Sequence, residues 1–152
     1  MTYRFKTLII TCLLYSFCYG YNGEYDQCFY GAGTYYNIDY RVLKAIAKVE
    51  SGFNPYAINV NKNRTVDIGI MQINSSWLNR LSLYGINQNH LYNPCYNIYL
   101  GAWILRQCIN KYGNTWKSID CYNKGTRARE NSLYVWKVYK ELQKQIILTY
   151  AR

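Results

Sequence analysis

The 152-residue sequence contains a single histidine, His90, and no two cysteines spaced as Cys-x-x-Cys. Zinc sites in proteins are built mainly from cysteine and histidine, and Ser-His-Asp or Cys-His nucleophiles need a histidine as base. The scarcity of histidine therefore disfavours both kinds of site. We expect no metal and no organic cofactor, and we expect His90 on the surface or in a loop.

Acidic residues are also scarce: eight stand against 18 lysines and arginines, for a formal net charge of +10. A basic surface favours an anionic partner. Nucleic acid would suit the charge, but the basic residues are spread along the chain rather than clustered. We therefore expect no nucleic-acid partner.

Long apolar runs are absent except at the N-terminus, where Arg4 and Lys6 precede about a dozen mostly apolar residues, too few for a comfortable membrane span. Cys18 and Gly20 are small residues suited to a signal-peptidase site. We interpret residues 1–20 as a secretory signal and 21–152 as one mature domain. The alternative is an uncleaved anchor. After cleavage we expect a monomer without a membrane span, exported to the periplasm.

The remaining cysteines are even in number, which in an exported domain predicts two disulfides. Three pairings are possible. We favour Cys28–Cys95, which would tie the N-terminal segment to the start of a later helix. That choice leaves Cys108–Cys121.

One acidic residue stands at the end of a predicted helix. Apolar residues recur at helical spacing from Asp39, a plausible N-cap, to Glu50, and Gly52 would end the helix. Glu50 would then lie in the last turn, where partial burial and the helix dipole both raise a carboxyl pKa. Such a carboxyl stays protonated near neutral pH and can act as a general acid. From the helix alone, a solvent-exposed glutamate is the alternative.

A second acidic residue, Asp67, lies in a stretch with strand character. Ile58 and Val60 alternate with polar residues, residues 61–64 resemble a turn, and a second short run follows. A small β-hairpin is predicted, which would bring Asp67 beside the helix that carries Glu50.

The residues after this hairpin suggest a ligand site. Gly69 would let the backbone pass close to a ligand. Met71 would offer an apolar contact, and the amides of Gln72 and Asn74 are of the kind that bind sugar hydroxyl and acetamido groups.

Three stretches in this order resemble the motifs of the soluble lytic transglycosylase family: Glu-Ser-Gly-Phe-Asn at 50–54, Gly-Ile-Met-Gln-Ile-Asn at 69–74 and Cys-Tyr-Asn-Lys-Gly at 121–125. The third motif of the family is Ala-Tyr-Asn-Ala-Gly, so Cys121 and Lys124 depart from it. The chain is most similar to small secreted members that serve specialised (type III) secretion machines, the IpgF and EtgA kind.

The resemblance implies a lysozyme-like fold and cleavage of the β-1,4 bond between N-acetylmuramic acid and N-acetylglucosamine, with 1,6-anhydro products. Peptidoglycan, with its peptide carboxylates, also fits the basic charge and the export. Glu50 would be first acid and then base, and Tyr122 would lie near it, with its phenol toward the carboxyl or the sugar. Ser51 and Asn123 would contact substrate. The alternative for Tyr122 is a core tyrosine.

Residues 49–54 and 65–77 are also similar to c-type lysozymes, whose two acidic residues are both catalytic. Lysozyme is a standard example of the two-carboxylate pattern. This resemblance gives Asp67 the role of stabilising positive charge at the sugar C1, whereas a hydrogen bond within the hairpin is its alternative. A lysozyme-type hydrolase and a non-enzymatic glycan-binding scaffold therefore remain open.

The whole chain predicts a mainly helical α+β domain with one small β-hairpin beside the catalytic helix. We expect further helices near 27–35, from Ser75 or Ser76 to about 85, over 95–111, 115–121 and 131–148, with loops at 86–92 and 124–131. Trp77 and Trp116 are expected in the core.

Overall fold

The computed structural model describes residues 23–150, so the predicted signal at 1–20 lies outside the described residues. The helices are α2 (Asp26–Tyr36), α3 (Tyr40–Ser51), α4 (Leu78–Leu81), α5 (Gln88–Leu91), α6 (Pro94–Tyr112), α7 (Trp116–Lys124) and α8 (Leu133–Tyr150). The strands are β1 (Ile58–Val60), β2 (Val66–Ile68) and β3 (Ile73–Asn74), and single 3-10 turns lie at Ser75–Trp77, Ser82–Tyr84 and Gly125–Arg127. The prediction of a mainly helical α+β domain is confirmed.

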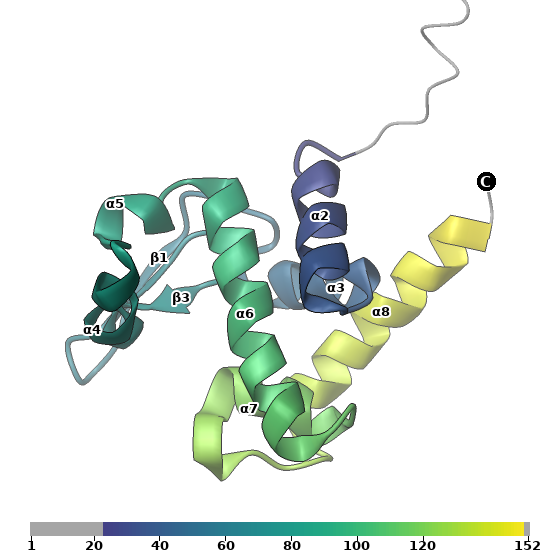
Figure 1. Cartoon of the computed structure of the whole chain (residues 1–152). Helices are drawn as coiled ribbons and strands as arrows, with labels where there is room; N and C mark the ends of the chain where they lie inside the picture. The colour runs from purple at the N-terminus through teal and green to yellow at the C-terminus, as the bar shows by residue number, and fades with distance from the viewer. Residues whose placement is uncertain (1–22, 151–152) are drawn as a thin grey trace, which may run out of the picture.

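Helix α6 runs through the middle of the molecule and separates two parts (Figure 1). The sheet and the short helices α4 and α5 lie on one side of it, and α2, α3 and α8 lie on the other. The core is continuous across this division, with buried residues from α2, α3, the sheet and α6 in one cluster. The sheet is thus held against a helical body.

Helix α3 begins and ends where its local sequence predicts. The Asp39 side chain accepts a hydrogen bond from the backbone N of Arg41 (2.9 Å), and Gly52 ends the helix with a left-handed φ of 65°. Leu43 and Ile46 are fully buried, and α3 packs mainly against α8. This packing fixes the last turn, where Glu50 lies.

The predicted hairpin is present, but it belongs to a three-stranded antiparallel sheet in the order β1-β2-β3. Asp67, in the central strand, lies opposite Asn59 on one side and Asn74 on the other. The third strand was not predicted, because it is only two residues long and depends on contacts with α6.

A buried asparagine on α6 joins this helix to β2 and to the segment between β2 and β3. The Asn97 Nδ2 donates to the carbonyls of Ile68 and Leu91 (2.8 Å each), and its Oδ1 accepts from the Met71 N (2.8 Å). A Cβ on Gly69, whose φ is +81°, would lie 2.4 Å from the Asn97 Nδ2. The close approach that we expected of Gly69 is therefore to the protein's own interior and not to a ligand.

Both predicted disulfides are confirmed. Cys28–Cys95 joins α2 to the start of α6, and Cys108–Cys121 joins the last part of α6 to α7. The second bond holds the helix that carries the third motif.

Three local predictions were wrong. Residues 86–92 contain α5, because the Asn87 side chain and His90 form a reciprocal cap at its start. Helix α7 extends to Lys124, so the third motif lies mostly on the helix. The Trp116 side chain is 38% exposed and stands edge-on to Tyr139, so it is not in the core. In the part of the chain from residue 23 to 150, no helix has the length and hydrophobicity that a bilayer crossing requires.

Candidate active site

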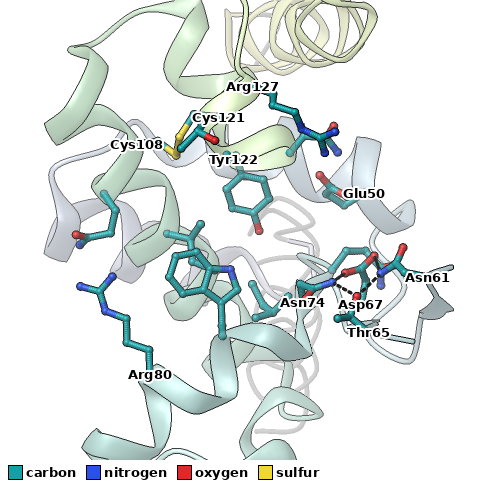
Figure 2. Close-up of a pocket in the computed structure, with 18 of the residues that line it drawn as sticks. Glu50, Asn61, Thr65, Asp67, Asn74, Arg80, Cys108, Cys121, Tyr122 and Arg127 are labelled. Carbon is teal, nitrogen blue, oxygen red and sulfur yellow. Dashed lines mark hydrogen bonds between the residues drawn. A yellow bond between two sulfur atoms is a disulfide. The ribbon is translucent and has the colours of Figure 1, made fainter. Parts of the chain in front are cut away.

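An open cleft of about 1180 Å³ lies between the sheet and the helices α6 and α7 (Figure 2). Most of the residues predicted for the site line it: Glu50 from α3, Asp67, Gln72 and Asn74 from the sheet region, and Tyr122 and Asn123 from α7. Ser51 and Met71 do not. The structure thus brings together both carboxylates and the third motif.

Glu50 lines the cleft from the last turn of α3. Burial raises the pKa of its carboxyl to about 7, a hydrogen bond from Tyr134 lowers this pKa, and the nearby charge of Asp67 raises it. The Tyr134 hydroxyl donates to the Glu50 Oε1 at 2.5 Å. Among residues 23–150 no lysine, arginine or histidine forms an ion pair with Glu50. The carboxyl can therefore hold a proton near neutral pH and remain oriented.

Sequence reasoning missed Tyr134. It lies on α8 and is 9% exposed, with Val135 and Val138 buried beside it. A phenol within the inward stripe of a predicted helix was the available signal, because a buried hydroxyl needs a polar partner. Nothing local identifies that partner, which lies 84 positions earlier in the chain.

Asp67 is held by side-chain amides. Its Oδ2 accepts from the Asn61 Nδ2 (2.9 Å), and its Oδ1 accepts from the Asn74 Nδ2 (2.6 Å). The Thr65 hydroxyl accepts from the same two amides, at 3.2 and 2.9 Å. We call Asn61, Thr65, Asp67 and Asn74 the amide clamp; Figure 2 shows it on the side of the cleft below Glu50. The clamp fixes the carboxylate toward the cleft.

The amides expected to bind sugar are partly occupied by the protein itself. Besides its bonds in the clamp, Asn74 accepts from the Ser76 N (2.9 Å). Gln72 donates from its Nε2 to the carbonyls of Ala57 (3.1 Å) and Gly69 (2.9 Å), and it accepts from Asn59 at 2.5 Å. Both residues line the cleft, but their hydrogen bonds serve mainly to shape it.

Two predicted substrate contacts do not reach the cleft. Met71 is fully buried, and its side chain packs so closely against Gly101 of α6 that a Cβ at that position would contact it. The Ser51 hydroxyl donates to the Ile70 carbonyl (2.7 Å) and also approaches the Ala47 carbonyl (3.3 Å). Ser51 thus joins α3 to the segment between β2 and β3, and Met71 joins that segment to α6. The expectation that their side chains bind sugar directly is not met.

Tyr122 lies in the centre of the cleft wall in Figure 2. Its hydroxyl donates to the Met71 carbonyl at 2.7 Å, so the expected hydrogen bond to Glu50 is made by Tyr134 instead. Burial, together with the charges of Glu50 and Asp67, raises the pKa of the Tyr122 phenol well above its ordinary value. Asn123 is exposed, and no hydrogen bond of its side chain to another described residue is recorded, which leaves its amide available to a ligand.

The arrangement supports acid–base chemistry on a glycosidic bond. The buried carboxyl of Glu50 can hold a proton near neutral pH, and the Asp67 carboxylate is held by amide donors, which matches the division of roles that glycoside cleavage uses. Within residues 23–150, no three His, Cys, Asp or Glu side chains gather closely enough to hold a metal ion.

Comparison with known proteins identifies the group to which this cleft belongs. Residues 27–145 match the family described as Transglycosylase SLT domain. Protein IpgF of Shigella sonnei is 40% identical over 124 residues, which cover 79% of this chain and 81% of the relative. Invasion protein IagB of Salmonella typhimurium is 33% identical over 129 residues, or 80% of this chain and 81% of that protein.

A solved structure gives the same architecture. The X-ray structure of an inactive mutant of lytic transglycosylase Slt from Pseudomonas aeruginosa superposes with a TM-score of 0.57 and 20% identity. The match covers 79% of this chain but only 22% of the larger Slt chain. The likeness shows the lysozyme-like fold expected from the motifs.

Proposed function

Since the chain belongs to the transglycosylase SLT domain family and is a peptidoglycan lytic transglycosylase, we propose that Glu50 is its single acid and base. The observation that carries this proposal is the environment of that carboxyl. Burial raises the pKa of Glu50 to about 7, and Tyr134 holds its Oε1 at 2.5 Å. A group with a pKa near the working pH can both give and take a proton.

The reaction then has two proton transfers on one residue. Glu50 protonates the oxygen of the bond between N-acetylmuramic acid and N-acetylglucosamine as that bond to C1 breaks. The 6-hydroxyl of the muramyl sugar bonds to C1 and returns its proton to Glu50, which forms the 1,6-anhydro ring. Asp67, oriented by the amide clamp, faces the developing positive charge and stabilises it.

The remaining polar groups support these two carboxylates. Tyr134 orients Glu50, and Tyr122 supports the wall through its bond to the Met71 carbonyl. Asn123 is the amide that we assign to direct sugar binding, because it lines the cleft with no recorded partner among the described residues. No cofactor is assigned to the reaction.

The competing function is lysozyme-type hydrolysis, and the second carboxylate, Asp67, is the feature that favours it. The two functions differ in their products. Mass analysis of muropeptides released from purified sacculi should give fragments with 1,6-anhydro ends, one water lighter than hydrolytic fragments and resistant to borohydride. Reducing ends released by the wild type would instead make the chain a hydrolase, and binding without release would support a scaffold.

We also infer a location and a cellular task. Residues 1–20 would direct export to the periplasm, where peptidoglycan lies, and the N-terminal sequence of the exported protein tests this cleavage. The similarity to a relative named an invasion protein supports local wall opening for a secretion apparatus. Replacing the wild type by Glu50→Gln in the native cell should then lower apparatus assembly while leaving growth unchanged; equal assembly would contradict this task.

A further inference from the structure

The cleft carries four cationic side chains around its two carboxylates. They are Lys62 at the turn after β1, Arg80 on α4, Lys111 in the last turn of α6, and Arg127 in the 3-10 turn after α7. Figure 2 shows Arg80 across the cleft from Asp67, and Arg127 near the Glu50 end. Glu50 and Asp67 are the two acidic residues among those that line the cleft.

None of these cations has an acidic partner in the described part of the chain. The ion pairs there are Arg41–Asp39, Lys44–Asp26, Lys124–Asp120 and Lys144–Glu141. Two of the free cations are instead positioned by aromatic rings. The Arg80 guanidinium lies 5.3 Å from the centre of the Trp103 ring, and the Lys111 Nζ lies 5.1 Å from that of Tyr112.

Helix α6 aligns these two charges along one wall. Trp103, Gln107 and Lys111 are four residues apart and therefore lie on one face of the helix. Gln107 and Lys111 both line the cleft, and Arg80 covers Trp103 at the other end of this row. Positions 103 and 111, at the two ends of this row, are about two helical turns, or roughly 12 Å, apart along the helix.

We propose that Arg80 and Lys111 form a carboxylate-binding wall that selects glycan strands bearing acidic peptide stems over strands without these charges. This inference rests on the function proposed above, since it assigns substrate specificity to the same cleft. Unpaired cations lining a cleft focus a positive potential that attracts and orients anionic ligands. A neutral sugar chain would fill the same cleft without engaging them.

Binding is measured without cleavage, so the test is independent of the reaction products. In a Glu50→Gln background, tryptophan fluorescence gives the affinity for soluble uncrosslinked peptidoglycan strands and for the same strands with their carboxyls converted to carboxamides. Arg80→Gln/Lys111→Gln should bind native strands about tenfold more weakly, since exposed ion pairs are each worth up to a factor of about five. Its affinity for amidated strands should change by less than about twofold, because carboxamides form no ion pairs with Arg80 or Lys111.

Two matched variants identify the source of the loss. Arg80→Lys/Lys111→Arg keeps both charges and should retain the preference for native strands. Lys137→Gln/Lys140→Gln removes two exposed charges from α8, whose residues 137 and 140 do not line the cleft, and should also retain it. Added salt should weaken native-strand binding and reduce the difference between the two substrates.

Several results would overturn the proposal: an equal loss on native and amidated strands, no loss on native strands, an equal loss in the α8 variant, or no binding of either strand. Thermal melting of every variant identifies any loss caused by unfolding. Hydrolytic products from the wild type would refute the transglycosylase step but would leave this binding comparison intact.

Discussion

Glu50 and Asp67 face the same cleft from two regions that surround a carboxyl differently. Glu50 lies in the last turn of a helix packed against α8, and within the described part of the chain its side chain has one hydrogen bond, from the Tyr134 phenol. Asp67 lies in the middle strand of a small sheet and accepts two amide hydrogen bonds. The helix region makes the charged form of its carboxyl costly, whereas the sheet region supplies donors to a charged carboxylate.

This contrast explains how two carboxyls can take two roles. The pKa of Glu50 is raised to about 7, mainly by burial and to a smaller extent by the charge of Asp67. Asp67 therefore has two effects in the proposed mechanism: it stabilises the sugar cation, and it helps Glu50 to stay protonated. The predictions below separate these effects, beginning with the largest.

Removing the acid should have the largest effect. Glu50→Gln should lower the rate of peptidoglycan cleavage by about a thousandfold or more, because both proton transfers lose their donor and acceptor. Glutamine can still accept the Tyr134 hydrogen bond, so the fold should persist. Release of soluble muropeptides from sacculi measures the rate. Glu130→Gln, an exposed change outside the cleft, is the control, and a folded Glu50→Gln enzyme with normal activity would refute the assignment.

Neutralising the second carboxylate should have a smaller effect. In a transglycosylase the substrate's own hydroxyl attacks C1, so Asp67→Asn should lower activity by about 10- to 1,000-fold, at about 1.4 kcal/mol of barrier per tenfold. Asn61→Ala leaves the carboxylate but removes one donor of the clamp, and it should lose up to about tenfold.

The products distinguish the two possible roles of Asp67. They should remain 1,6-anhydro sugars in the wild type and in both clamp variants, as mass analysis of the released fragments would show. An unchanged rate in Asp67→Asn would mean that this carboxylate has no catalytic part. A rate as low as that of Glu50→Gln would indicate the nucleophile of a hydrolase.

The burial of Glu50 should also make the free energy of unfolding depend on pH. Its pKa is about 7 in the folded protein, against an ordinary value of 4.5, so between these pH values the folded state holds the proton more tightly than the unfolded state. The free energy of unfolding of the wild type should therefore fall as pH rises through this window, by about 3 kcal/mol from this residue.

Glu50→Gln has no proton to lose at this position. Its stability relative to the wild type should therefore increase by about 3 kcal/mol between pH 4 and pH 8, as urea unfolding at several pH values would measure. Glu130→Gln should show no such trend. A constant difference between Glu50→Gln and the wild type across this range would mean that Glu50 is not desolvated.

The helix region of Glu50 and the sheet region of Asp67 also differ in how well the sequence predicts them. The helix of Glu50 is specified locally, by the Asp39 cap, the apolar spacing and Gly52, and these predictions were confirmed. The hairpin was predicted from alternation and turn residues, but the segment that leads into the third strand is held by Asn97, which accepts a hydrogen bond from the Met71 N and lies 26 positions away. Local sequence patterns cannot identify such a partner, because they describe neighbouring residues and not the distant side chains that these residues contact in the folded chain.

The same limit applies within the site. The motifs predicted that Glu50, Asp67 and Tyr122 lie around one cleft, and the structure agrees. Resemblance to a family of known fold indicates which distant residues meet, whereas periodicity does not. It did not show that Met71 and Ser51 serve the interior, or that Asn74 holds Asp67. Amides and hydroxyls near an active site have two possible partners, substrate and protein, and only the folded chain distinguishes them.

The smallest expected effect concerns the contact that the sequence did not indicate. The Tyr134 hydroxyl donates to the Glu50 carboxyl and lowers its pKa, in opposition to burial. Tyr134→Phe should therefore raise the pKa of Glu50 further, by about one pH unit if a hydrogen bond to a charged group contributes about 1.5 kcal/mol. The protonated acid would persist to higher pH, so the alkaline limb of kcat/KM should move upward by that amount. The rate at the optimum should fall by less than about tenfold, because the acid remains but is less well oriented.

Tyr139→Phe, on the outer face of the same helix, should leave the pH profile unchanged. An unshifted alkaline limb in Tyr134→Phe would mean that this phenol only fills space beside Glu50, and a downward shift would mean that its hydrogen bond stabilises the protonated form.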